Sequence, residues 1–194
     1  MTSLKNIYER IYQDSITDVQ NPDHKNSDKG TVHSYIDYYD SLFSPFQSKK
    51  IRILEIGIQG GISLLLWKDY FKQAEVVGID IDIKQAQKKV LDICADPTSG
   101  ISLIEADAAD YSILDKIHGN FDIIIDDGSH LLHHQLASFK FFKDRLNLGG
   151  IYIIEDIGNE LNARTLNQKI PNSEIVDLRS VKGRWDDLIL VYRK

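Results

Sequence analysis

Cysteine is almost absent from this chain: Cys94 is the only thiol among 194 residues. A single thiol excludes an intrachain disulfide, and its apolar neighbours at helical spacing predict a packed side chain rather than a nucleophile. No apolar run is long enough to span a membrane. The N-terminus contains acidic residues and lacks the apolar core of a signal peptide, so we expect a cytoplasmic protein.

Basic residues are outnumbered by acidic ones. The 23 lysines and arginines face 29 aspartates and glutamates, for a formal net charge of -6, and the longest basic cluster is Lys49-Lys50-x-Arg52. We therefore expect neither nucleic acid nor a membrane as partner, and predict a small molecule instead. The hydrophobic content of 42% and charged content of 27% are ordinary for a globular protein of one domain.

From residue 51 onward, apolar runs alternate with helix-length segments. Strands are predicted at 51–56, 76–80, 101–104, 121–126 and 150–154, with helices at 62–72, 84–95, 111–117 and 132–146. Strands joined by helices pair in parallel through right-handed crossovers. Two further strands, 173–178 and 188–193, are joined by about nine residues, too few for a well-formed helix, which predicts an antiparallel final strand. We expect an α/β, Rossmann-like fold with a seven-stranded, mostly parallel sheet and helices on both faces.

A glycine turn opens this alternating region. The stretch from Ile51 to Asp82 contains a strand, Gly57, Gly60 and Gly61, a helix, and a second strand that ends on Asp80. This is the pattern of a nucleotide-binding half-unit, in which glycines admit a ligand to the backbone and the terminal carboxylate accepts hydrogen bonds from ribose hydroxyls. The glycine turn alone leaves an NAD-linked oxidoreductase open, although Glu55-x-Gly57-x-x-Gly60 differs from the dinucleotide fingerprint.

Each of the first five strands ends in an acidic residue. Strands 121–126 and 150–154 are expected to be neighbours, so Asp127 should lie close to Glu155 and Asp156. Three converging carboxylates repel one another unless a cation lies between them, and oxygen ligands suit Mg²⁺, Ca²⁺ or Mn²⁺. This end of the sheet is therefore predicted to hold a divalent cation.

His130 follows Asp127 by three residues and is the predicted general base. A hydroxyl bound to the cation has a lowered pKa, and a neutral imidazole can take its proton near pH 7. The resulting alkoxide is a stronger nucleophile than the hydroxyl. A zinc site formed by His130, His133 and His134 is disfavoured because that helix contains no cysteine or acid to complete it.

The motifs resemble those of a known family. The E-x-G-x-x-G turn resembles class I S-adenosylmethionine-dependent methyltransferases. IIIDDGSH at 123–130 and GGIYIIED at 149–156 are similar to the metal-dependent sugar O-methyltransferases of macrolide biosynthesis and to the cephalosporin hydroxylase and rhamnosyl O-methyltransferase-like group. The resemblance implies His130 as catalytic base, Asp127, Glu155 and Asp156 as metal ligands, and as cofactor-binding residues Glu55, Gly57, Gly60, Gly61, Ser63, Asp80 and Asp107.

The N-terminal region contains two predicted helices, 2–14 and 32–42, separated by a polar loop at 15–31. Asp28-Lys29-Gly30-x-x-His33-x-Tyr35 resembles the family's D-K-x-x-x-H-x-Y segment, which packs near the cofactor as a lid. We therefore expect a helical lid or oligomerisation segment at 1–45 and an S-adenosylmethionine-binding catalytic domain at 46–194. The helices carry more apolar surface than a lid requires, so a homo-oligomer is expected.

Together these features predict an O-methyltransferase that uses S-adenosylmethionine and Mg²⁺ or another divalent cation. Its acceptor is expected to be a hydroxyl of a sugar or of a glycosylated small molecule, as in natural-product or polysaccharide biosynthesis. Three alternatives stay open: a cephalosporin hydroxylase-like enzyme, an NAD-linked oxidoreductase, and a non-catalytic cofactor-binding scaffold. The chain has no obvious iron site of two histidines and one carboxylate, which disfavours the hydroxylase.

Overall fold

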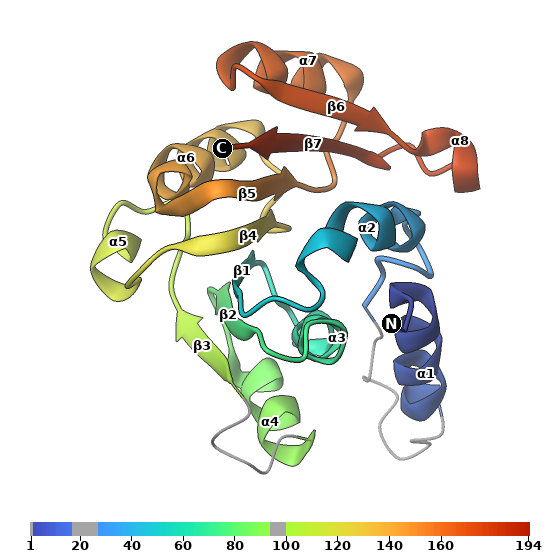
Figure 1. The fold of residues 1–194 in the computed structure, drawn as a ribbon. Coiled ribbons are helices and arrows are strands. Elements are labelled where there is room, and N and C mark those ends of the chain that lie inside the picture. The colour runs from blue at the N-terminus through green and yellow to red at the C-terminus, as the bar shows by residue number, and fades with distance from the viewer. Residues whose placement is uncertain (1, 17–26, 94–99) are drawn as a thin grey trace.

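The computed structural model describes residues 2–16, 27–93 and 100–194. Its centre is a seven-stranded sheet with the strand order β3-β2-β1-β4-β5-β7-β6 (Figure 1). The strands are β1 Arg52–Ile56, β2 Glu75–Asp80, β3 Ile101–Glu105, β4 Phe121–Asp126, β5 Leu146–Ile154, β6 Ser173–Asp177 and β7 Leu188–Arg193. Cys94 and most of the predicted 15–31 loop lie outside the described residues.

The sheet confirms the predicted topology. Strands β1 to β5 pair in parallel, and β7 runs antiparallel to both of its neighbours, β5 and β6. The chain moves outward from β1 to β3 and then returns to β4 on the other side of β1. The carboxyl ends of β1 and β4 therefore flank the point where ligands bind in such sheets.

Helices cover both faces of the sheet, as predicted. They are α1 Leu4–Ile16, α2 Tyr35–Phe43, α3 Ile62–Tyr70, α4 Lys84–Ile93, α5 Ile113–Lys116, α6 Leu132–Phe142, α7 Glu160–Lys169 and α8 Arg179–Lys182. One apolar cluster joins Ile53 and Ile123 of the sheet to α1, α2 and α3. A second joins Leu54 and Ile124 to α5, α6 and α7. Because adjacent strand residues point to opposite faces, both must be apolar, which explains the continuous apolar runs.

The N-terminal helices belong to the core of the same sheet. Leu4 of α1 and Tyr39 and Phe43 of α2 are buried in one cluster with Trp67 of α3. The backbone N–H of Leu4 also donates to Asp40 Oδ1 at 2.9 Å. The described part of residues 1–45 is therefore packed onto the sheet, while its role as a lid or oligomerisation segment stays a prediction.

Some predicted boundaries are wrong. The helix predicted at 132–146 ends at Phe142, a 3₁₀ turn follows at Lys143–Arg145, and β5 begins at Leu146 rather than at 150. Helix α7 was not predicted at all, because its sequence ELNARTLNQK buries only Ala163 and Leu166. Its one local signal is Asn159, whose side chain caps the helix by accepting from the N–H of Asn162 at 2.8 Å.

The linker between β6 and β7 contains one short helical turn, α8, which ends at Gly183 in the left-handed conformation (φ +74°). None of the helices in the described ranges is long and apolar enough to cross a membrane.

Candidate active site

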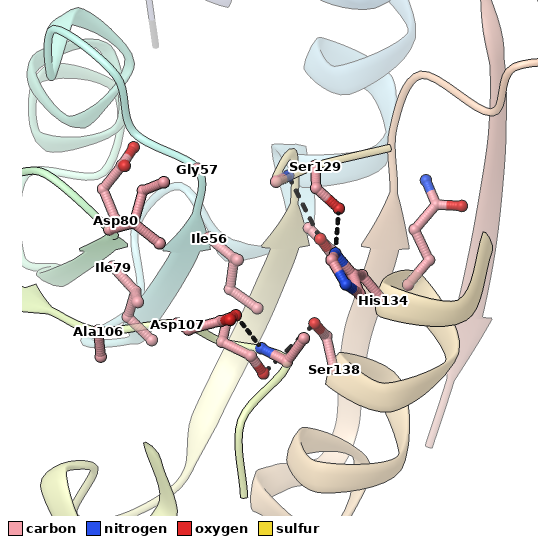
Figure 2. A pocket seen from close by; sticks show the side chains of 15 residues that line it. Ile56, Gly57, Ile79, Asp80, Ala106, Asp107, Ser129, His134 and Ser138 are labelled. Atoms are coloured by element: carbon pink, nitrogen blue, oxygen red, sulfur yellow. Dashed lines mark hydrogen bonds between the residues drawn. The ribbon is translucent and has the colours of Figure 1, made fainter. Parts of the chain in front are cut away.

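A cavity of about 180 Å³ opens at the carboxyl ends of β1, β2 and β4. Figure 2 shows Gly57 and Asp80 on one side of it and Ser129 and His134 on the other. The rest of its polar lining consists of Asp107, which follows β3, Asp126 at the end of β4, and Gln135 and Ser138 of α6. Three residues of the predicted cofactor-binding set, Gly57, Asp80 and Asp107, therefore share one cavity.

The turn after β1 requires glycine at its first position. Gly57 has a φ of +82°, and a Cβ there would lie 2.0 Å from the carbonyl oxygen of Asp127. Gly61 also has a positive φ (+77°), and its Cβ would meet Ala86 of α4 at 2.9 Å. Since Gly57 packs against the backbone of Asp127, the glycine turn adjoins one residue of the acidic cluster described below.

The carboxylates of Asp80 and Asp107 are oriented by backbone N–H groups. Asp80 Oδ2 accepts from Gln59 at 2.8 Å, and Asp107 Oδ1 accepts from Ala109 at 2.8 Å. A carboxylate has about four lone-pair positions, so each retains acceptor capacity beyond these bonds. Both residues therefore remain suited to binding hydroxyl or amino groups of a ligand.

Glu55 and Ser63 lie behind the cavity wall rather than in its lining. Glu55 is fully buried and accepts from Trp67 Nε1 at 2.9 Å. Burial raises the pKa of Glu55, while Lys29 and the Ser63 hydroxyl oppose that rise. These two members of the predicted cofactor-binding set therefore interact with each other and with Lys29 or Trp67, and neither lines the cavity.

Asp127, Glu155 and Asp156 converge at the ends of β4 and β5, and the side chain of Lys29 reaches into the cluster. Its Nζ lies 2.7 Å from Asp127 Oδ2, 2.5 Å from Glu155 Oε2 and 3.4 Å from Glu55 Oε1, and the side chain is 1% exposed. Burial opposes the charged form, but Asp127, Glu155 and Glu55 hold the pKa of Lys29 well above its usual value. The Lys29 ammonium group is thus a cation that the chain itself supplies to the acidic cluster.

Two tyrosines of α2 donate to the same cluster. The Tyr39 hydroxyl donates to Glu155 Oε1 at 2.6 Å, and the Tyr35 hydroxyl donates to Asp156 Oδ1 at 2.5 Å. Both oxygens of Glu155 are therefore bound, one by Tyr39 and one by Lys29. Burial raises the pKa of Glu155 well above its usual value. Burial also raises the pKa of Asp156.

His130 stands at the exposed edge of the cluster. Its Nε2 lies 3.2 Å from Asp127 Oδ1 and 3.8 Å from Asp156 Oδ2, and its side chain is 41% exposed. The hydrogen bond with Asp127 raises the pKa of His130. Asp127, His130 and Asp156 each offer an atom within 4.8 Å of the others, as a metal site requires.

The zinc set considered from the sequence is not brought together. His134 Nδ1 hydrogen-bonds with Ser129 Oγ at 2.7 Å in the cavity, whereas His130 faces Asp127. The side chain of Asp126, next to Asp127, does not join the acidic cluster. Its Oδ2 lies 3.4 Å from the hydroxyl of buried Tyr152, and burial raises the pKa of Asp126 to about 7.

A second buried group adjoins the cluster. His33 Nδ1 lies 2.7 Å from Asp187 Oδ1, and its Nε2 lies 3.4 Å from Asp156 Oδ2. His33, Asp156 and Asp186 also offer atoms within 4.8 Å of one another. The sequence placed Lys29, His33 and Tyr35 only in a lid, and nothing in their spacing shows that they contact the acids. Only their burial next to the acids marks these three residues as part of the site, and that burial is produced by the fold.

The family of the chain follows from comparison with known proteins. Residues 54–157, more than half of the chain, match a family profile described as a methyltransferase domain. These residues contain the glycine turn, the cavity-lining acids and the acidic cluster. The chain therefore belongs to the methyltransferase-domain family.

Its relatives among characterised proteins are sugar O-methyltransferases. One, 8-demethyl-8-alpha-L-rhamnosyl tetracenomycin-C 2'-O-methyltransferase of Streptomyces olivaceus, is 37% identical over 140 residues, which are 68% of this chain and 35% of that protein. Another, mycinamicin VI 2''-O-methyltransferase of Micromonospora griseorubida, is 34% identical, over 66% of this chain and 32% of that protein. The chain thus spans about a third of the length of these relatives.

A solved structure of the methyltransferase MycE, in complex with Mg and SAH, is similar with a TM-score of 0.63 and 30% identity. The similarity covers 80% of this chain and 37% of that one. The SAH-bound Podospora anserina methyltransferase PaMTH1 matches 96% of this chain and 87% of its own at a TM-score of 0.65. At 19% identity, that match shows the fold alone.

Proposed function

We propose that this chain is an S-adenosylmethionine- and divalent-cation-dependent O-methyltransferase acting on a hydroxyl of a sugar or glycosylated small molecule. The observation that carries the proposal is the contact between the glycine turn and the acidic cluster at Gly57 and Asp127. A methyl donor bound at the turn would then lie beside a hydroxyl held at the cluster. Relatives named for methylating rhamnosyl groups and mycinamicin support the acceptor class.

The cavity residues fit S-adenosylmethionine, which when bound would supply the electrophilic methyl group. Asp80 is positioned to bind the ribose hydroxyls, and Asp107 the adenine side. Gly57 keeps this turn packed against the loop after β4, because any side chain there would collide with the backbone of Asp127. Gly60, Gly61, Glu55 and Ser63 shape and support this turn.

The acidic cluster fits a hard divalent cation, which would lower the pKa of an acceptor hydroxyl. Asp127, Glu155 and Asp156 are the proposed ligands. Asp127 and Asp156 direct oxygens toward His130 on the exposed side, whereas Glu155 accepts from Lys29 with one oxygen and from Tyr39 with the other, so only its remaining lone pairs would be open to a cation. The similarity to MycE, whose structure is in complex with Mg, supports the use of a divalent cation.

His130 is the proposed base. When its Nε2 donates to Asp127, its Nδ1 is the nitrogen that accepts the hydroxyl proton. Asp127 then stabilises the imidazolium, which is consistent with the raised pKa of His130. The partly exposed ring is within reach of an acceptor that arrives from solvent.

Two alternatives are weaker. An iron site of a hydroxylase would need both His33 and His130 as ligands together with Asp156. Each group of possible metal ligands in the described residues contains only one histidine, and His33 is paired with Asp187. For an NAD-linked oxidoreductase, nothing in the glycine turn restores the dinucleotide fingerprint. Calorimetry with NADH and with S-adenosylhomocysteine distinguishes an oxidoreductase from a methyltransferase.

The test is calorimetric titration of the chain with S-adenosylhomocysteine, with and without Mg²⁺, for wild type, Asp80→Ala and Asp127→Asn. We expect Asp80→Ala to weaken binding of the nucleoside and Asp127→Asn to abolish only the effect of Mg²⁺. Wild-type protein that binds no S-adenosylhomocysteine would overturn the proposal.

We further propose that residues 1–45 form the lid and oligomerisation segment of a cytoplasmic homo-oligomer, with residues 46–194 as the catalytic domain. Support comes from Lys29 and Tyr35, which carry this segment into the acidic cluster. Light scattering of the purified chain measures its oligomeric state.

A further inference from the structure

The two tryptophans of the chain lie in opposite environments. Trp67 is fully buried against Glu55, whereas Trp185 is 62% exposed. Trp185 is the largest of the exposed apolar side chains in the described part of the chain, and an indole offers a wide apolar face together with one hydrogen-bond donor.

The loop that carries Trp185 is anchored. Asp186 and Asp187, which follow it, are buried, and Asp187 is bonded to His33. Asp186 pairs with Arg184, with Nε to Oδ1 at 2.5 Å and Nη2 to Oδ2 at 3.0 Å. The indole is therefore presented from a fixed backbone, which suits a binding surface better than a mobile loop does.

The indole adjoins the proposed catalytic cluster. A Cβ added at Gly158, two residues after Asp156, would lie 3.8 Å from Trp185 Cζ3. On the other side, the Tyr35 hydroxyl that donates to Asp156 lies 3.4 Å from the carbonyl oxygen of Asp186. Trp185 is thus linked to Asp156 through Gly158 on one side and through Asp186 and Tyr35 on the other.

Two further apolar side chains are exposed, Val32 and Val181 of α8. Lys182 joins their segments by donating to the carbonyl oxygens of Gly30 and His33. The guanidinium of Arg184 lies 6.0 Å from the indole ring centre and adds hydrogen-bond donors at its border. Apolar area with a few polar groups is typical of small-molecule sites.

We propose that Trp185 binds the acceptor and that its indole packs against the C–H face of the sugar ring to be methylated. The proposal rests on the proposed function. A pyranose ring has a face lined by C–H bonds and hydroxyls around its edge. The apolar indole can pack against that face, and the guanidinium of Arg184 can donate hydrogen bonds to the hydroxyls at the edge. Trp185 thus determines specificity for glycosides and has no part in proton transfer.

The first test uses fluorescence, because only Trp67 and Trp185 emit strongly. Protein saturated with S-adenosylhomocysteine and Mg²⁺ is titrated with methyl α-L-rhamnopyranoside and methyl α-D-glucopyranoside. We expect the emission of the exposed indole to change in wild type and in Leu148→Ala, an exposed apolar control on β5. We expect no change in Trp185→Phe, in which only buried Trp67 remains.

The second test measures methyl transfer to the same glycosides. We expect Trp185→Ala to raise KM for the glycoside about tenfold, as loss of a stacking platform does, with kcat nearly unchanged. Trp185→Phe should restore most of the affinity because it keeps an aromatic face. The Kd for S-adenosylhomocysteine should not change in either variant.

The outcomes separate the two proposals. If wild type methylates a glycoside and Trp185→Ala does so with unchanged KM, the role of Trp185 is refuted and the proposed function stands. If wild type binds S-adenosylhomocysteine but neither methylates the glycosides nor changes its emission with them, both proposals fail. A tenfold KM effect that phenylalanine reverses supports both.

Discussion

Replacing Lys29 with methionine removes the ammonium group that contacts Glu55, Asp127 and Glu155 and keeps a side chain of similar length. Removing one partner of a buried ion pair costs about 3–5 kcal/mol because it leaves an unpaired buried charge. Three carboxylates depend on this ammonium, so we expect the upper half of that range. A domain of this size is stable by only about 5–15 kcal/mol, so the variant should be close to unfolding.

The assay is urea denaturation followed by circular dichroism, with Trp67 fluorescence as a second probe because its indole donates to Glu55. The matched control is Lys72→Met. Lys72 also pairs with a carboxylate, that of Asp69, but its side chain is 72% exposed. We expect the control to change the free energy of unfolding by less than about 0.5 kcal/mol.

The pH dependence gives an independent check. Without Lys29, the pKa values of Glu55 and Glu155 rise further above their unfolded values, so the folded variant binds protons that the unfolded chain has released. Stability therefore falls as pH rises, and the deficit against wild type should shrink as pH is lowered from 7 to about 5. Mg²⁺ should also raise the melting temperature of the variant more than that of wild type. A deficit under about 1 kcal/mol, or one that grows at lower pH, would refute the account of Lys29.

Three further predictions concern the site. Gly57→Ala should abolish binding of S-adenosylhomocysteine in calorimetry, because the new Cβ would lie 2.0 Å from the backbone of Asp127. The control is Gly149→Ala, which should bind normally because Gly149 has a similar φ of +78° but open space around it. His130→Gln should lower kcat about 10²- to 10⁴-fold with an unchanged Kd for S-adenosylhomocysteine; an unchanged kcat would exclude it as the base. Because Asp127 raises the pKa of His130, wild-type kcat should fall as pH is lowered through a pKa above 6.5, and a profile that is flat between pH 6 and 8 would contradict this.

The sheet was predictable because its strands are apolar on both faces and end in acids. The runs before Asp80, Asp127 and Glu155 fixed the strand positions, and the helical links fixed the parallel pairing. The antiparallel β7 followed from its short connection to β6. Helix α7 escaped prediction because only Ala163 and Leu166 are buried, which is too few positions to show a helical period.

The acids of the site were predictable and their partners were not. Parallel strands bring Asp127, Glu155 and Asp156 to one edge whatever else the chain does. Lys29 lies about a hundred positions from Asp127 in a polar stretch, and its burial exists only because α2 docks on the sheet. The cation site expected from the sequence stays a prediction, and the structure shows that a lysine of the chain provides positive charge at these carboxylates.

The central claim is methyl transfer from S-adenosylmethionine to a glycoside hydroxyl, dependent on a divalent cation. The most direct measurement is transfer of a labelled methyl group to a panel of glycosides and nucleotide sugars, with Mg²⁺ and with EDTA. We expect an O-methylated product with Mg²⁺, and its loss with EDTA and in Asp127→Asn. Equal turnover in EDTA-stripped protein, or no labelled product from any sugar acceptor by protein that binds S-adenosylhomocysteine, would contradict the account.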